Sequence, residues 1–200
     1  MKILYLCRKG YYNTKMSRVR FDGMEAISKV ADVIWSGNGW DNYDKTKNVN
    51  ENIDILYGDQ KPDIVVAYKP QDFIDFPAVT IPKCIRYNEM WPVKEWTQEI
   101  NNFGFNLVIA HHLNDIPKYN HIKDVKFVHI PHSASQTIFK DYEENKVYDV
   151  LFTGAMSPKH YPFRGRLLNI LRNRLANVVG CKVLGHPGGN LKSVDRKSVV

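Results

Sequence analysis

Short apolar runs alternate with longer amphipathic segments through the first two thirds of the chain. The runs of strand length lie at residues 2–7, 33–36, 64–68, 79–87, 107–110 and 125–130. The segments at 16–31, 49–57 and 92–102 carry apolar residues at helical spacing. Strands that alternate with helices are typical of βα units, in which helices cover both faces of a parallel sheet. The pattern therefore predicts a doubly wound, Rossmann-like α/β domain.

One of these runs contains a residue that does not suit the middle of a strand. Pro82 lies within the run at 79–87. Proline has no N–H group to donate to a neighbouring strand. We therefore expect either a bulge in this strand or a late start.

A second pattern of the same kind follows a polar link at residues 143–146. An apolar strand is expected at 148–153, and the turn from Gly154 to Pro158 ends it. Pro162 then opens a helix whose apolar stripe consists of Phe163, Leu167, Leu171 and Leu175, and a further strand is expected at 177–184. The sequence thus predicts an N-terminal domain at residues 1–142 and the first βαβ unit of a second Rossmann-like domain at residues 143–194.

The last six residues are interpreted as an artefact. Residues 195–200, DRKSVV, are the in-frame translation of GATCGGAAGAGCGTCGTG, a common short-read sequencing adapter. We expect natural sequence to end near Val194 and the gene to continue beyond it. The six residues are therefore excluded from the fold prediction.

The net charge of +7 is distributed unevenly. Residues 1–100 carry 14 basic and 14 acidic side chains, whereas residues 101–200 carry 14 basic and 7 acidic ones. Seven basic residues and no acidic one lie between Val150 and Val194. This segment should favour an anion. The alternative is a solvated helix face whose acidic counterpart lies elsewhere in the protein.

Cysteine usage and hydropathy indicate a cytoplasmic protein without a membrane span. Cys7, Cys84 and Cys181 are far apart and lie in apolar strands, so we expect reduced core residues rather than disulfides or a metal site. No apolar run reaches the length of about 18 residues that a membrane helix needs. The N-terminal apolar stretch is too short for an export signal.

The candidate chemistry lies in the loops after the predicted strands. The sequence contains no GxxxxGK[ST] loop, GxGxxG fingerprint, HExxH helix or GxSxG elbow. Open α/β sheets bind ligands beyond the carboxyl ends of their strands. The loops there carry Arg8, Lys9, Tyr11, Tyr12, Tyr68, Lys69, Asn88, Glu89, Trp91, His111, His112 and His132. Such an edge suits a sugar, since aromatic faces stack on the ring and polar side chains bond its hydroxyls.

Three stretches of sequence resemble the GT-B glycosyltransferase-like proteins of the spore-maturation type, the CgeB-like group. They are CIRYNEMW at 84–91, FVHIPHSASQTIF at 127–139 and YDVLFTGAMSPKHYPFRGRLLNIL at 148–171. The last is the most specific, because it has the strand, the short loop and the arginine-bearing helix of that family. The resemblance implies a GT-B-like fold and a glycosyltransferase that moves a sugar from a nucleotide-sugar donor to a glycan or another hydroxyl acceptor.

The resemblance also places the donor diphosphate at the start of the second domain. The predicted donor contacts are Gly154, Ser157, Lys159 and Arg164. A glycine lets backbone N–H groups approach phosphate, while a helix N-terminus and an arginine both favour anions. In the alternative, Gly154 is a plain strand-ending turn, and the neighbouring arginines are solvated.

The first domain is then the acceptor side. The predicted acceptor contacts are Arg8, Tyr11, Tyr12, Lys69, Asn88 and Trp91. The candidates for the base that takes the acceptor proton are Glu89 first, then His112, His132 and Asp22. Glu89 could instead pair with Arg86, and each histidine could simply cap a strand end. No cofactor or metal is expected, since cationic side chains can stabilise the departing nucleoside diphosphate.

Two other functions remain open at this point. The chain could be a non-enzymatic module that binds a nucleotide or sugar, because fold alone does not fix function. Nucleic-acid binding is disfavoured, since the first half is balanced in charge and no known module is present. A complete GT-B enzyme carries a longer second domain, so we expect this chain by itself to bind donor weakly and to turn over little.

Overall fold

The computed structural model describes residues 1–13, 23, 25–73, 75–87, 90–131, 143, 145, 149–154, 161–175 and 180–185. The chain divides into two compact units, Met1–Ser135 and Gln136–Val200. The division falls slightly before residue 142, where the sequence places the domain boundary.

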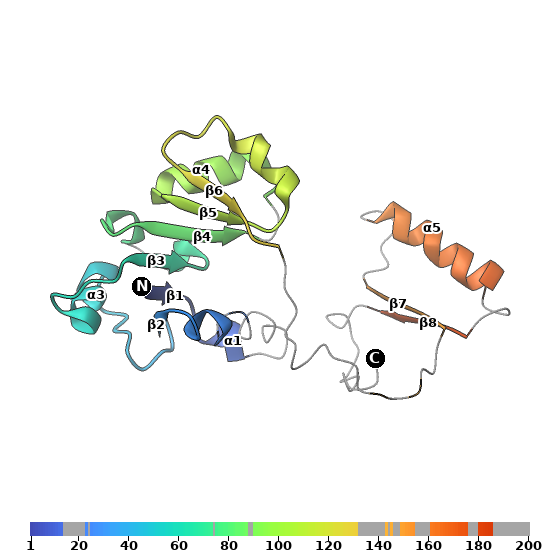
Figure 1. The fold of residues 1–200 in the computed structure, drawn as a ribbon, viewed down its shortest axis with the longest axis horizontal. Coiled ribbons are helices and arrows are strands. Elements are labelled where there is room, and N and C mark those ends of the chain that lie inside the picture. The colour runs from blue at the N-terminus through green and yellow to red at the C-terminus, as the bar shows by residue number, and fades with distance from the viewer. Residues whose placement is uncertain are drawn as a thin grey trace. The chain divides into compact units, whose positions relative to one another are not determined.

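A six-stranded parallel sheet forms the centre of the first unit (Figure 1). Its strands are β1 (Lys2–Leu6), β2 (Asp32–Ser36), β3 (Ile64–Ala67), β4 (Lys83–Tyr87), β5 (Leu107–Ala110) and β6 (Lys126–His129). They lie in the order β2-β1-β3-β4-β5-β6, and every neighbouring pair is parallel. The predicted α/β, Rossmann-like class is confirmed for this unit.

The helices of this unit begin and end at local signals in the sequence. They are α1 (Gly10–Asn13), α3 (Val49–Tyr57) and α4 (Val93–Phe103), with 3-10 turns η2 (Pro70–Asp72), η3 (Phe76–Ala78) and η4 (Leu113–Tyr119). Asn48 accepts a hydrogen bond from the Glu51 backbone, and the Glu51 carboxylate accepts one from Asn48 N–H. This reciprocal pair is a capping box, which fixes the start of α3 at the predicted residue.

Pro82 sets the start of β4. The strand begins at Lys83, and the Pro82 carbonyl accepts a hydrogen bond from Val65 N–H at 2.9 Å. The late start expected from the sequence is thus confirmed. Proline supplies the acceptor that β3 needs here, and its missing N–H falls outside the ladder.

Apolar side chains cover the two faces of the sheet differently. On one face, Leu4, Val65 and Val108 pack with Ile53 of α3 and Ile100 of α4 in the main core. On the other, Tyr5 and Cys7 pack with the partly buried side chains of Tyr11, Val33, Trp35, Trp40, Val66 and Tyr68. The first face is the principal hydrophobic core, and the second brings aromatic rings toward the carboxyl end of the sheet.

Two cysteines behave as the sequence predicts. Cys7 and Cys84 are free thiols and both are buried. Burial raises the pKa of the Cys84 thiol to about 12, so this thiol stays protonated and unreactive at neutral pH. The side chain of Cys181 lies outside the described residues.

The described part of the second unit is a parallel βαβ arrangement. Strands β7 (Val150–Gly154) and β8 (Cys181–Gly185) pair in parallel, with Gly154 opposite Gly185. Helix α5 (Pro162–Ile170) lies between them in sequence and continues as a π-helical turn, η5 (Leu171–Leu175). The predicted strand, helix and strand are therefore present.

The apolar stripe of α5 differs from the prediction. Leu171 of the predicted stripe is buried, whereas Phe163 is 69% exposed. Leu168, which the prediction left out, is also buried, so the buried face contains Leu168 and Leu171, three residues apart. Among the described residues, no helix has both the length and the apolar character needed to cross a membrane.

Candidate functional site

The strand order reverses between β1 and β3. The chain runs from β1 outward to β2 on one side, and then returns to β3 on the other side of β1. In open parallel sheets the loops on either side of such a reversal diverge, so ligands bind there, beyond the carboxyl ends of the strands. The residues that follow β1 and β3 are therefore the primary candidates for a binding site.

Five side chains from these two loops form what we call the switch-point cluster: Arg8, Tyr11, Tyr68, Lys69 and Asp72. Lys69 Nζ donates a hydrogen bond to Tyr11 Oη at 3.3 Å and lies 4.5 Å from the centroid of the Tyr11 ring. The rings of Tyr11 and Tyr68 meet edge to face, with centroids 5.7 Å apart. The structure thus brings together the predicted residues Arg8, Tyr11 and Lys69.

The backbone of Lys69 has an uncommon conformation. Its φ of 57° and ψ of 72° lie in the left-handed region, and it precedes η2 as the N-cap residue. A residue with a Cβ atom pays about 1–2 kcal/mol relative to ordinary backbone in this region. Strained non-glycine residues of this kind cluster at binding sites. The ammonium group of Lys69 contacts Tyr11.

Arg8 and Asp72 form the ion pair of the cluster. Arg8 Nη2 donates to Asp72 Oδ1 at 2.9 Å, and the Asp72 side chain is only 11% exposed. The second oxygen, Asp72 Oδ2, is buried and has no hydrogen-bond partner among the described residues. A buried acceptor without a donor costs about 1–3 kcal/mol. Asp72 Oδ2 can therefore accept a hydroxyl or N–H group of a ligand.

The loop after β2 lies against the end of β1. Trp40 Nε1 donates to the Cys7 carbonyl at 3.0 Å. A Cβ atom on Gly37, whose φ is +130°, would lie 2.4 Å from the same oxygen. Lys9 Nζ lies 5.6 Å from the Trp40 ring centroid and 3.6 Å from the Asp41 carboxylate. Only glycine at position 37 allows the β2 loop to lie this close to the Cys7 carbonyl. The contact holds the loop beside the residues that follow β1.

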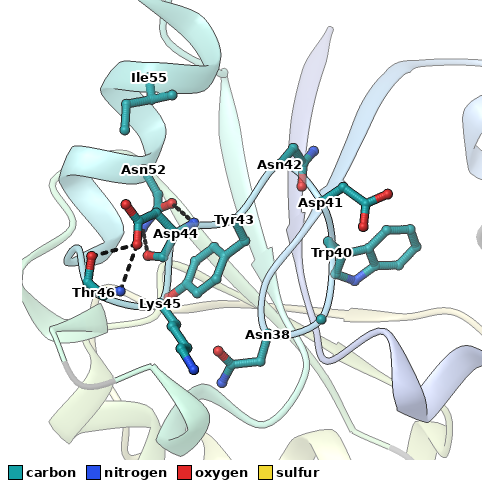
Figure 2. A pocket seen from close by; sticks show the side chains of 11 residues that line it. Asn38, Trp40, Asp41, Asn42, Tyr43, Asp44, Lys45, Thr46, Asn52 and Ile55 are labelled. Carbon is teal, nitrogen blue, oxygen red and sulfur yellow. Dashed lines mark hydrogen bonds between the residues drawn. The ribbon is translucent and has the colours of Figure 1, made fainter.

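An open depression of about 720 Å³ is lined by this loop, from Asn38 to Thr46, and by two residues of α3, Asn52 and Ile55. Figure 2 shows Asp44 turned toward Thr46 and Asn52. Asp44 Oδ1 accepts from both the hydroxyl and the N–H group of Thr46, and these bonds lower the pKa of Asp44. Asn52 Nδ2 donates to the Asp44 carbonyl at 2.9 Å. These polar groups mainly hold the loop itself.

Another hydrogen-bonded group lies at the ends of β4, β5 and β6. Arg86 Nε donates to His111 Nε2 at 2.6 Å, and His111 Nδ1 lies 2.6 Å from the Ile130 carbonyl. Because a carbonyl only accepts, His111 Nδ1 carries the proton and Nε2 is the acceptor. His111 is 4% exposed. It is thus a neutral, buried residue that orients the Arg86 guanidinium.

Two predicted site residues, Trp91 and His112, lie near the ion pair of Lys118 and Asp115. Lys118 Nζ donates to Asp115 Oδ1 at 2.6 Å and lies 6.0 Å from the ring centroid of Trp91, which is 72% exposed. Partial burial acts to raise the pKa of Asp115, but hydrogen bonds from Lys118 and from Met90 N–H lower it overall, with a smaller contribution from His112. Trp91 therefore lies near the lysine of this pair, and His112 acts on its carboxylate.

Several predicted site residues lie outside the described residues. They are the catalytic candidates Glu89, His132 and Asp22, the acceptor candidate Asn88 and the donor candidates Ser157 and Lys159. Tyr12 lies in α1, but its side chain is not described. In the second unit, Gly154 ends β7, and the Arg164 guanidinium lies 4.2 Å from the ring centroid of Tyr161.

The sequence did not single out Asp72 or His111 as site residues. Asp72 lies in a short turn with no motif, and its pairing with Arg8 spans 64 positions. His111 was named beside His112, but the latter was chosen as the candidate base, and nothing in the sequence distinguishes the buried ring from the exposed one. Among the described residues, no group of three or more potential ligands could hold a metal ion.

Comparison with known proteins adds no assignment to this geometry. No protein-family model matches the chain, and no match was found among the curated proteins.

Proposed function

We propose that the chain is part of a glycosyltransferase that uses a nucleotide-sugar donor, with the first unit on the acceptor side and the second on the donor side. The observation that carries the proposal is the switch-point cluster at the reversal of strand order. The cluster combines aromatic rings, two cationic side chains and a buried carboxylate oxygen that has no partner in the described part of the chain. These are the groups that bind a sugar ring and its hydroxyls.

The chemistry of the cluster suits an acceptor rather than the reacting phosphates. The rings of Tyr11 and Tyr68 offer apolar surface for the carbon-bound hydrogens of a sugar. Asp72 Oδ2 accepts from a hydroxyl, and the ammonium group of Lys69 donates to one. The site therefore holds and orients the acceptor, while the base that removes its proton is assigned by the sequence to Glu89, His112, His132 or Asp22.

Support for the donor side comes from the second unit. Gly154 ends a parallel strand, and Arg164 lies in the first turn of the following helix, which contains no acidic residue in that turn. A guanidinium group and a helix N-terminus both favour a diphosphate. Stacking on Tyr161 restrains the guanidinium and lowers the entropy cost of binding. Arg164 is thus the donor contact that we test.

The proposal is tested by measuring donor binding and transfer with UDP-, GDP- and ADP-linked sugars. The assays use this chain and the product of any longer reading frame that continues beyond Val194. Arg164→Met should weaken donor binding at least about tenfold, because a charge-assisted bond worth about 1.4 kcal/mol is lost. Arg166→Met is the matched control, since Arg166 is an exposed residue of the same helix.

The outcomes separate an enzyme from a binding module. Transfer of labelled sugar together with release of nucleoside diphosphate supports the proposal. Donor binding without transfer by the longer product, under every acceptor tested, contradicts the enzyme and favours the non-enzymatic module. Equal donor affinity in the wild type and in Arg164→Met contradicts the donor assignment.

A further inference from the structure

The charges in the switch-point cluster do not balance. Arg8 is paired with Asp72 at 2.9 Å. No carboxylate of the described residues lies within ion-pair distance of Lys69 Nζ. Among the described residues, two cations of the cluster therefore face one carboxylate, and the excess positive charge is on Lys69. A ligand that places a negative charge near Lys69 completes the pairing.

Lys69 is also held in place before any ligand arrives. Its left-handed backbone, its hydrogen bond to Tyr11 and its contact with the Tyr11 ring restrict where the ammonium group can lie. An ammonium has three donors, and Tyr11 Oη accepts the one hydrogen bond made by Lys69 Nζ among the described residues. Because the cation is oriented in advance, binding an anion costs less side-chain entropy.

The unpaired oxygen of Asp72 lies one turn away. Asp72 N–H donates to the Lys69 carbonyl at 3.0 Å, and this bond closes η2. Lys69 thus offers donors to an anion, while Asp72 Oδ2, on the same turn, is an acceptor without a donor among the described residues.

We propose that the switch-point cluster binds an acidic sugar, in which an anionic group meets Lys69 and a hydroxyl of the same molecule meets Asp72 Oδ2. This inference rests on the proposed function and specifies its acceptor. A neutral sugar gains only ordinary hydrogen bonds from Lys69. An anion gains in addition the Coulomb attraction of the ammonium group.

Isothermal titration at low ionic strength with glucose, glucuronate and glucose 6-phosphate tests the inference. At least one of the two acidic sugars should bind tenfold or more tightly than glucose, and added salt should reduce that preference. The glucuronate and glucose 6-phosphate arms determine whether the anion is a carboxylate or a phosphate. Equal affinity for all three sugars, or no detectable binding of any, overturns the inference.

Variants of the cluster test whether it causes the preference for acidic sugars over glucose. Lys69→Met should abolish it and lower the affinity for glucose only about fivefold, through the loss of one ordinary hydrogen bond, and Lys69→Arg should restore at least half of the preference, because the charge returns. Asp72→Asn should weaken binding of glucose, because an amide NH₂ can replace the oxygen that accepts the sugar hydroxyl. Lys61→Met is the control, because Lys61 pairs with Asp54 on an exposed surface. An unchanged preference in a folded Lys69→Met variant overturns the inference.

The inference and the proposed function fail in different ways. Binding of an acidic sugar with no transfer from any nucleotide-sugar overturns the proposed function and leaves the ligand class intact. Transfer to neutral sugars with no preference for acidic ones overturns the ligand class and leaves the enzyme intact.

Discussion

Arg86 Nε donates a 2.6 Å hydrogen bond to His111 Nε2, and this contact joins the ends of two neighbouring strands, β4 and β5. On its other side the His111 ring donates from Nδ1 to the Ile130 carbonyl. The ring therefore has one fixed tautomer and holds the guanidinium in one direction at the carboxyl end of the sheet.

Replacing this ring should destabilise the first unit. His111→Phe removes the acceptor of Arg86 and the donor to Ile130, so two polar groups lose their partner, and the free energy of unfolding should fall by about 2–4 kcal/mol. Urea unfolding measures the change. His112→Phe is the control, since this neighbouring ring is exposed and should cost less than about 1 kcal/mol. Equal losses in the two variants would contradict the role given to His111.

Lys69→Gly should separate stability from binding. Glycine adopts the left-handed conformation without strain, although it also has more freedom in the unfolded chain. We expect the free energy of unfolding to rise by about 0.5–1 kcal/mol, while the affinity for acidic sugars falls at least tenfold. Thermal unfolding and titration on the same samples check both parts. A variant that is less stable than the wild type contradicts the assignment of strain to this backbone.

Gly37 should tolerate no side chain. In Gly37→Ala the new Cβ would lie 2.4 Å from the Cys7 carbonyl, and its φ of +130° is unfavourable for alanine. We expect a loss of at least about 2 kcal/mol in the free energy of unfolding. Gly10→Ala provides the comparison, since no heavy atom lies within 4 Å of a Cβ placed there. A neutral Gly37→Ala variant would show that the β2 loop does not lie against the end of β1.

The Asp115 carboxylate should make stability depend on acid pH. Its folded pKa lies below the ordinary value of 3.8, so its contribution is complete above that value and is lost as the pH falls through the folded pKa. We expect about 1 kcal/mol of stability at neutral pH to depend on this group. Asp115→Asn should remove the part of the pH dependence of urea unfolding that this group causes below about pH 4.

A control distinguishes Asp115 from surface carboxylates in general. Asp54 pairs with Lys61 and has an exposed side chain, and exposed pairs contribute little to stability. Asp54→Asn should therefore leave the acid dependence almost unchanged. If the free energy of unfolding depends on acid pH equally in the wild type and in Asp115→Asn, the prediction is contradicted.

Local signals allowed much of the first unit to be predicted from sequence. Helix α3 follows from the apolar spacing of Val49, Ile53 and Leu56, and Asn48 and Glu51 cap its first turn. The start of β4 follows from Pro82, because proline excludes one strand position by its own chemistry. Such features depend on residues that are close in sequence, so no knowledge of the fold is needed to find them.

The arrangement of the site could be predicted only in part. The loops that carry Arg8, Tyr11 and Lys69 follow from strand order, since carboxyl ends of parallel strands share an edge. The role of Asp72 depends on its pairing with Arg8 across 64 positions. The buried state of His111 depends on Arg86 and on the Ile130 carbonyl just after β6. The left-handed backbone of Lys69 has no sequence signal, because the residue is not a glycine.

The most direct test of the account is a backbone-amide chemical-shift map of the chain titrated with glucose 6-phosphate. The account predicts that the shifts concentrate at residues 8–11 and 68–72, which follow β1 and β3, and that Lys69→Met suppresses them. Shifts confined to the Asn38–Thr46 loop or to the ends of β4 and β5 would contradict the placement of the ligand at the reversal of strand order.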